Sequence, residues 1–222
     1  MILVTGASGK TGRTTTSALS AHGMDVRAIV RKNNQVNQLK KLGAKEVVVA
    51  DLLDSERMDE VFFGTTAIYH ICPNMHPQEE EIGQLMIRSA QKNHLKHFVY
   101  HSVLHPQVEA MPHHWKKMRV EDQIFKIKMP FTILQPAAYM QNVLGYLDDM
   151  LKTGEYRIPY STSSRTSMID LNDLAEVVVK VLSEPGHENA IYELVSSEAL
   201  SALDVATVVA SVTGKLILAG TL

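Results

Sequence analysis

Short and long hydrophobic stretches alternate along the first 135 residues. Six short apolar runs are rich in β-branched residues and have the length of buried strands, whereas the longer stretches between them carry hydrophobic residues at helical spacing. Parallel strands that are apolar on both faces need helical crossovers on both sides of the sheet. The pattern therefore predicts a doubly wound parallel α/β fold. The predicted strands are 2–5, 26–30, 46–50, 67–71, 97–100 and 131–134, and the predicted helices are 11–22, 35–42, 55–63, 78–93 and 114–126.

A glycine-rich loop, TGASGKTG, joins the first predicted strand to the first predicted helix. Gly6 permits a tight turn, Gly9 lets backbone amides approach a pyrophosphate, and Gly12 lets the helix pack against the strand. An ordinary βα turn can share this spacing, but the strand–turn–helix context favours a dinucleotide site of the Rossmann type. A Walker-type loop is excluded because no Gly-Lys-Ser/Thr follows at the required distance. The other loop residues, which either contact phosphate or face solvent, are Ser8, Lys10 and Thr11.

The end of the second predicted strand indicates which nucleotide is bound. An NAD-preferring site places an acidic residue there to hold the ribose 2′-hydroxyl, but this chain has Arg31 and Lys32. A guanidinium can make a charge-assisted contact with the 2′-phosphate, so we predict that NADP(H) is preferred over NAD(H). A solvated pair of surface cations is the alternative interpretation. Asp51, after the third predicted strand, either borders the adenine or caps the following helix.

The pattern becomes less regular after residue 135. We expect a Rossmann domain made of residues 1–135 with about 165–195, and a small substrate-side lobe made of about 136–164 and 196–222. The elements predicted in the second half are helices over 138–152, 172–182 and 201–213, strands over 190–195 and 215–218, and a polar, turn-rich segment over 154–167.

Composition narrows the function classes further. The 22 Lys and Arg against 24 Asp and Glu give a formal net charge of −2, which argues against nucleic-acid binding. The 45% of hydrophobic residues and 21% of charged residues are typical of a globular chain. One cysteine, no signal-peptide pattern and no long apolar run lead us to expect a cytoplasmic protein without a membrane span.

Candidate catalytic residues are concentrated just before and within the helix predicted over 114–126. Four histidines occur between His101 and His114 and offer a proton donor, although loop or surface histidines are the alternative. They lack a recognisable zinc spacing, so no metal is expected. Trp115, Tyr139 and Met140 offer apolar surface for a flat acceptor ring, or simply pack in the core.

Several segments together resemble the NmrA-like branch of the atypical short-chain dehydrogenase/reductase superfamily. The resemblance spans essentially the whole chain and is more specific than the glycine loop alone. It is carried by GASGKTG at 6–12, VRAIVR at 26–31, GAKEVVVAD at 43–51, HFVYHS at 97–102, PFTILQP at 130–136 and YMQN at 139–142.

The resemblance implies roles for residues at the nicotinamide end. The superfamily's Tyr-x-x-x-Lys falls at residues 113–117, where His113 replaces the tyrosine and Lys117 remains as a partner of the nicotinamide ribose. Ser102 stands where the superfamily has its serine. Relatives continue beyond the point where this chain stops, so the C-terminal lobe is expected to be incomplete. The residues expected to line the nicotinamide are Ile71, Cys72, Pro73, Asn74, Ser102 and Val103, with Cys72 either a redox-sensitive thiol or a small buried hydrophobe.

Two functional hypotheses follow. In the first, the protein is an NADP(H)-dependent reductase that transfers hydride to a quinone-like or conjugated aromatic acceptor, a small molecule that needs little help with protonation. In the second, it binds NADP(H) without turnover and reports the redox state to a protein partner. The resemblance includes both kinds of protein, and the sequence is also compatible with a homodimer. We favour the reductase on family analogy.

Overall fold

The computed structural model describes residues 1–222, which form two compact units. Unit 1 consists of Met1–Pro136 and Asn172–Leu194, and unit 2 of Ala137–Leu171 and Val195–Leu222. Each unit has its own hydrophobic core. The chain re-enters unit 1 at Asn172, several residues later than the boundary near residue 165 expected from the sequence.

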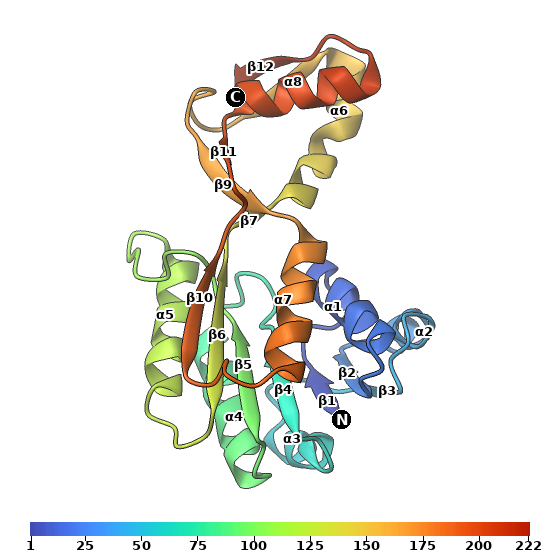
Figure 1. Ribbon diagram of the computed structural model, residues 1–222, viewed down its shortest axis with the longest axis vertical. Coiled ribbons are helices and arrows are strands. Elements are labelled where there is room, and N and C mark those ends of the chain that lie inside the picture. The colour runs from blue at the N-terminus through green and yellow to red at the C-terminus, as the bar shows by residue number, and fades with distance from the viewer. The chain divides into compact units, whose positions relative to one another are not determined.

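Unit 1 contains a seven-stranded, fully parallel sheet in the order β10-β6-β5-β4-β1-β2-β3 (Figure 1). The predicted doubly wound fold is confirmed. The order reverses direction between β1 and β4, where the chain leaves one half of the sheet for the other, and ligands of such sheets bind at this switch point. The strands are β1 (Ile2–Val4), β2 (Val26–Val30), β3 (Glu46–Val49), β4 (Ala67–His70), β5 (His97–His101), β6 (Phe131–Pro136) and β10 (Ala190–Leu194).

Helices cover both faces of this sheet because successive strand side chains point to opposite sides. One core cluster joins Val4 and Ala28 of the sheet to α1, α2 and α7, and the other joins Leu3 and Ile68 to α3, α4 and α5. Most boundaries lie within two residues of those predicted. The helices are α1 (Lys10–Ala21), α2 (Val36–Lys41) preceded by the 3-10 turn η1 (Asn33–Gln35), α3 (Ser55–Phe62), α4 (Glu79–Lys92), α5 (Pro112–Ile124) and α7 (Leu171–Ser183).

Unit 2 is built from short elements around Met150, Tyr156 and Ile158. Its strands form a three-stranded sheet in the order β11-β9-β7 and a parallel β12-β8 pair. The elements are β7 (Ala138–Tyr139), the 3-10 helix η2 (Met140–Tyr146), α6 (Leu147–Thr153), β8 (Glu155–Ile158), β9 (Thr166–Ile169), β11 (Ala199–Leu200), α8 (Ala202–Thr213) and β12 (Leu218–Thr221).

Three sequence predictions for this unit are wrong. The continuous helix over 138–152 is instead a strand, a 3-10 helix and a short α-helix, in a segment that contains the weak helix formers Asn142 and Gly145. The turn-rich segment 154–167 contains all of β8 and the first residues of β9, whose few apolar residues resemble a loop pattern. The final strand begins at Leu218 rather than Lys215. No helix is both long and apolar enough to cross a membrane.

Candidate functional site

The glycine loop is closed so tightly that side chains are excluded from it. Gly6 has a φ of +58°, and a Cβ added there would lie 2.7 Å from the Ile71 carbonyl oxygen at the end of β4. A Cβ on Gly12 would lie 2.4 Å from the Gly6 carbonyl oxygen. The Gly9 amide donates a hydrogen bond to that same oxygen at 3.0 Å. The loop is therefore held against both β4 and α1.

The loop ends at the N-terminus of α1, which carries no compensating negative charge. Gly9 is the N-cap residue, no side chain caps the helix, and its first turn has no acidic residue. Backbone N–H groups and the positive end of the helix dipole are thus available to an anion. Of the other predicted loop residues, Thr11 is buried, Ser8 is half-buried and Lys10 is exposed.

Thr5 ties β1 to β4 directly beneath this loop. Its Oγ1 accepts a hydrogen bond from the Ile71 amide at 2.8 Å and lies 3.0 Å from the Ile71 carbonyl oxygen and 2.8 Å from His70 Nδ1. One hydroxyl proton cannot serve both of the latter atoms, so the His70 tautomer decides which one receives it. His70 Nε2 is buried without a partner. Sequence reasoning missed this link, since Thr5 was considered only as the start of the glycine loop and His70 only as a strand residue.

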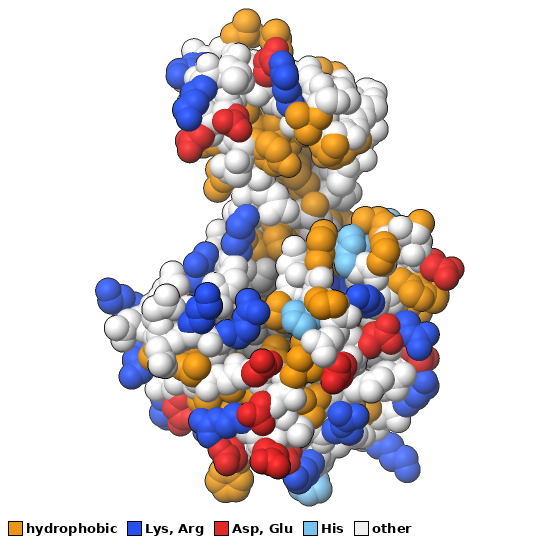
Figure 2. Space-filling view, turned by 180° about the vertical axis from the view of Figure 1, so that it is seen from behind, with side chains coloured by type: hydrophobic (Ala, Val, Ile, Leu, Met, Phe, Trp, Pro, Cys, Tyr) orange, Lys and Arg blue, Asp and Glu red, His pale blue; other side chains and the backbone are white.

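The two predicted 2′-phosphate ligands are exposed at the carboxyl end of β2. Arg31 and Lys32 form no ion pair, and Lys32 immediately precedes η1. Figure 2 shows several Lys and Arg side chains on the flank of unit 1 that carries α1 and α2. Asp51 is also exposed, and its Oδ1 accepts a hydrogen bond from the Leu53 amide. The alternative in which Asp51 caps the next helix is wrong, because Asp54 caps α3.

The residues expected around the nicotinamide follow two neighbouring strands, β4 and β5, and so reach the same edge of the sheet. Their exposure decreases toward the strands: Ile71 and Cys72 are buried, Pro73 and Val103 are half-buried and Asn74 is exposed. Burial, followed by the charge of Glu79, raises the pKa of the Cys72 thiol, so the thiol remains protonated and poorly reactive. The structure favours the buried-hydrophobe interpretation of Cys72.

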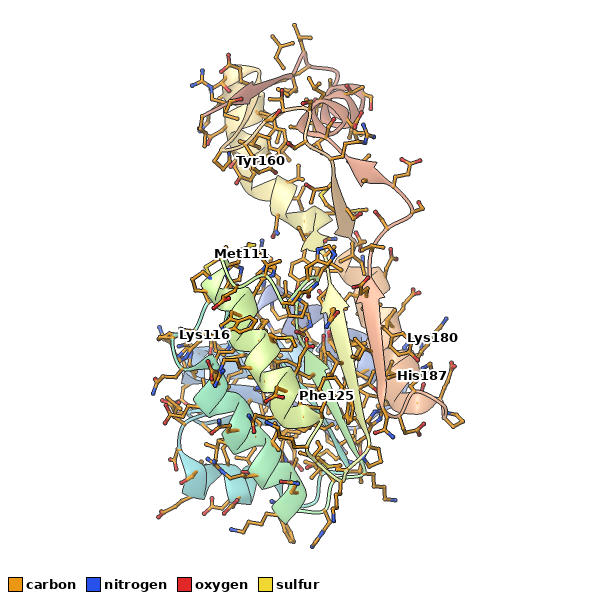
Figure 3. All side chains as sticks on the ribbon, turned by 90° about the vertical axis from the view of Figure 1, so that its left-hand side faces the viewer. Met111, Lys116, Phe125, Tyr160, Lys180 and His187 are labelled. Atoms are coloured by element: carbon orange, nitrogen blue, oxygen red, sulfur yellow. The ribbon has the colours of Figure 1, made fainter.

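Lys117 is held in a buried ion pair. It lies on α5, which runs from just after Met111 to just before Phe125 (Figure 3). Its Nζ donates to Glu79 Oε1 at 2.9 Å and to the His101 carbonyl oxygen at 3.1 Å. The Glu79 side chain is only 3% exposed and that of Lys117 only 13%. A charged pair this far from water needs complete hydrogen bonding to be tolerated.

A second buried carboxylate, Glu121, lies one helical turn further along α5. The Ser102 hydroxyl donates to it, and Gln135 Nε2 lies 3.0 Å from each of its oxygens. Burial raises the pKa of Glu121, while these hydrogen bonds act in the opposite direction. Ser102 is 2% exposed, so its hydroxyl proton is committed to Glu121 rather than to a bound molecule.

Neither acidic residue was predicted to matter. Glu79 begins a run of three glutamates, which is typical of a solvated helix terminus. A signal was nevertheless present: Glu79 precedes Ile82 and Met86 at helical spacing, and Glu121 lies beside Val120 and Ile124 on the buried face of α5. Helical periodicity that places one charge among apolar residues indicates a buried, partnered charge.

The four histidines occupy different environments. His113, in the position of the family tyrosine, packs edge-on against His114 with ring centroids 4.5 Å apart. Partial burial, His114 and Lys117 lower the pKa of His113. His101 does not belong with loop or surface histidines, since it is buried in β5 and its Nδ1 lies 2.6 Å from the Tyr69 hydroxyl. His105 is exposed in the loop after β5.

The predicted acceptor-contacting residues lie in different units. Trp115 is half-buried on α5 of unit 1. Tyr139 and Met140 are half-buried in unit 2, at the end of β7 and the start of η2. All three are accessible enough to contact a ligand, and none is a fully buried core residue.

Known proteins share both the sequence pattern and the fold. An NAD(P)H azoreductase from Xenophilus azovorans is 27% identical over 217 residues, which cover 97% of this chain and 74% of the azoreductase. Two solved structures superpose on the whole chain. They are an NADPH-dependent quinone oxidoreductase from Escherichia coli, complexed with NADPH (TM-score 0.89, 23% identity, 78% of that chain covered), and a Citrobacter triphenylmethane reductase complexed with NADP(H) (TM-score 0.88, 24% identity, 79% covered).

At such identities the two structures establish the fold alone. Family membership rests on a more specific comparison, because the sequence model of the NmrA-like family matches residues 1–218. That match includes the glycine loop, the Arg31 strand end and the α5 segment described above. The chain belongs to the NmrA-like family.

Proposed function

We propose that this protein is an NADP(H)-dependent reductase that transfers hydride to a quinone-like or conjugated aromatic acceptor. The observation that carries the proposal is the glycine loop, in which backbone atoms occupy the space that a Cβ on Gly6 or Gly12 would need. Such a loop at the switch point of a parallel sheet fits a dinucleotide pyrophosphate. The names of the azoreductase, the quinone oxidoreductase and the dye reductase support the reaction class.

Unit 1 supplies the cofactor site in this proposal. The loop amides and the α1 N-terminus bind the pyrophosphate, and Arg31 with Lys32 binds the 2′-phosphate. Lys117 donates to the nicotinamide ribose through its third N–H, since the Glu79 carboxylate and the His101 carbonyl oxygen accept from only two of the three ammonium donors. When bound, the nicotinamide supplies the hydride. The remaining predicted contacts are kept: Ser8, Lys10 and Thr11 at the phosphates, Asp51 at the adenine, and Ile71–Asn74 with Ser102 and Val103 at the nicotinamide.

The proton supply of this site limits the choice of acceptor. The family tyrosine is replaced by His113, whose lowered pKa makes the charged, donating form scarcer at neutral pH. The Ser102 proton is held by Glu121. A quinone or extended dye is electrophilic enough to accept hydride with weak or solvent-derived protonation, whereas a simple carbonyl is not. We keep Trp115, Tyr139 and Met140 as the residues expected to contact the acceptor.

Turnover of NADPH tests the reductase directly. Purified protein mixed with NADPH and a panel of quinones and dyes should consume the cofactor faster than a protein-free control. Lys117→Met keeps the aliphatic stem but removes the charge, and it should lower kcat/KM about 100-fold. A cofactor misplaced by about 1 Å reacts about 100-fold more slowly. Lys126→Ala, which removes an exposed lysine beyond the same helix, is the matched control and should leave the rate unchanged. Lack of consumption with every acceptor would contradict the reductase.

Arg31→Ala tests the choice of nucleotide. Only NADPH carries the 2′-phosphate, and charge-assisted hydrogen bonds contribute roughly 1.5–3 kcal/mol, so NADPH affinity should fall about 10- to 100-fold. NADH affinity should change less than about threefold, because NADH has no 2′-phosphate for Arg31 to bind. Fluorescence titration with both nucleotides measures this, with exposed Lys40→Ala on α2 as control. Equal losses for both nucleotides would refute the assignment of Arg31.

A non-catalytic NADP(H) sensor is the second candidate, and the replacement of the family tyrosine by His113 favours it. A sensor must distinguish the oxidised from the reduced cofactor by affinity, since a ligand shifts an equilibrium only by its differential affinity for two states. Tight NADPH binding, a clear difference in affinity for NADP and no turnover across the acceptor panel would favour this candidate over the reductase.

A further inference from the structure

We propose that Glu79 is a positioning residue that, together with Tyr100, holds the Lys117 ammonium at the carboxyl edge of the sheet. This inference rests on the proposed function, in which Lys117 contacts the nicotinamide ribose. The three residues come from three elements: Glu79 from the first turn of α4, Tyr100 from β5 and Lys117 from the middle of α5. They are called the Lys117 clamp below.

The hydrogen bonds of the clamp meet at one carboxylate oxygen of Glu79. Tyr100 Oη donates to Glu79 Oε1 at 3.0 Å, and Lys117 Nζ donates to the same oxygen at 2.9 Å. Glu79 Oε1 thus accepts one hydrogen bond from a neutral phenol and one from an ammonium, and the three side chains share this one atom. Burial and the Glu79 charge raise the pKa of Tyr100 well above its ordinary value, which keeps this hydroxyl a donor.

The clamp leaves one Lys117 donor for a ligand. Glu79 and the His101 carbonyl oxygen take two of the three ammonium donors. The Nζ atom lies 5.3 Å from the centroid of the Tyr100 ring, so this ring covers another side of the ammonium. The third donor has no acceptor within the protein, and the Lys117 side chain keeps 13% of its surface exposed, so this donor can bind a ligand. A lysine stem has four rotatable bonds, and without the clamp that donor would have no fixed position.

The clamp differs from the other ion pairs of the chain. Of the nine ion pairs, it is the only one in which both side chains are less than 15% exposed. Exposed pairs contribute little to stability, and a buried pair is often no better than an apolar pair of the same volume. Glu121, by contrast, is satisfied by the neutral donors Ser102 and Gln135. A buried charged pair beside the proposed cofactor site is therefore better explained by placing Lys117 than by stabilising the fold.

Glu79→Gln tests the clamp because it keeps the shape of the side chain and removes its charge. The first readout does not depend on turnover: modification of Lys117 by an amine-reactive reagent, followed by peptide mass spectrometry. We expect modification about 10-fold faster than in the wild type, since the ammonium is released, and Tyr100→Phe should give a smaller acceleration. Glu80→Gln, which removes the neighbouring surface carboxylate paired with Arg119, is the control and should change nothing. An unchanged modification rate in Glu79→Gln would overturn the clamp.

NADPH affinity then tests whether the clamp acts through Lys117. Glu79→Gln should weaken NADPH binding about 10-fold in a fluorescence titration, and adding Glu79→Gln to Lys117→Met should cause no further loss. If the double variant lost affinity by the product of the two single losses, Glu79 would act independently of Lys117 by supporting α4, and the positioning role would be overturned. If circular dichroism shows that Lys117→Met is unfolded, Glu79→Gln alone decides. Faster modification of Lys117 together with wild-type NADPH affinity would then overturn the positioning role. Failure of the proposed function is recognised separately, as wild-type protein that binds NADPH but consumes none.

Discussion

Gly12→Ala should lower the affinity for NADPH about 100-fold, because the glycine loop would have to open to accept the new methyl group. The added Cβ would lie 2.4 Å from the Gly6 carbonyl oxygen and 2.5 Å from the Ala7 Cα, and both are backbone atoms that cannot rotate away. Overpacking of this kind costs roughly 1–3 kcal/mol, and about 3 kcal/mol corresponds to a 100-fold change in affinity. The loss falls on binding because the displaced amides are those proposed to contact the pyrophosphate.

The matched control is Gly145→Ala in unit 2. Gly145 is exposed, its φ is not positive, and a Cβ there would meet no atom within 4 Å. Fluorescence titration should give wild-type NADPH affinity for this variant, and thermal unfolding should show that both variants are folded. If folded Gly12→Ala bound NADPH within about threefold of the wild type, a difference of roughly 0.6 kcal/mol, the loop would not be the pyrophosphate site.

The free energy of unfolding should fall steeply as the pH drops below 6.5, since two buried histidines must gain protons when the chain unfolds. Burial, followed by the charge of Lys117, lowers the pKa of His70 and that of His101 to about 3 each. Between pH 6.5 and about 3 the unfolded chain therefore binds more protons than the folded one, so stability is present above this window and is lost within it. Each histidine contributes a slope of about 1.4 kcal/mol per pH unit, or about 2.7 for both.

Urea unfolding at a series of pH values measures this slope. Glu121 acts in the opposite direction just above pH 4.5, because its raised pKa lets the folded state hold a proton that the unfolded state releases. His70→Gln and His101→Gln should each lower the slope between pH 6.5 and 5 by up to about 1.4 kcal/mol per pH unit, and the lowered pKa values of His97 and His113 add to the slope that remains. His22→Gln, at the exposed end of α1, is the control. A slope that neither buried substitution changes would show that these two imidazoles are not the groups that titrate.

The sequence alone was sufficient for the features that depend on local pattern. Short apolar runs that alternate with stretches of helical spacing in the first 135 residues predicted the parallel sheet, because run length and a period of 3.6 residues are properties of the chain itself. The glycine spacing predicted the tight loop for the same reason: a turn with positive φ and close backbone approach selects glycine at Gly6 and Gly12. The motifs at 97–102 and 130–136 were specific enough to indicate the family.

Only the tertiary structure decided the environment of each polar side chain. Glu79 lies in an acidic run that looks solvated, yet packing of α4 against β5 and α5 buries it against Tyr100 and Lys117. His101 lies among loop histidines in the sequence, yet it belongs to a central strand. In unit 2, the segment 138–152 has helical spacing but folds as a strand and two short helices. For Glu79 and His101 the physical reason is the same: burial and hydrogen-bond partners are set by residues distant in the sequence, which no local pattern records.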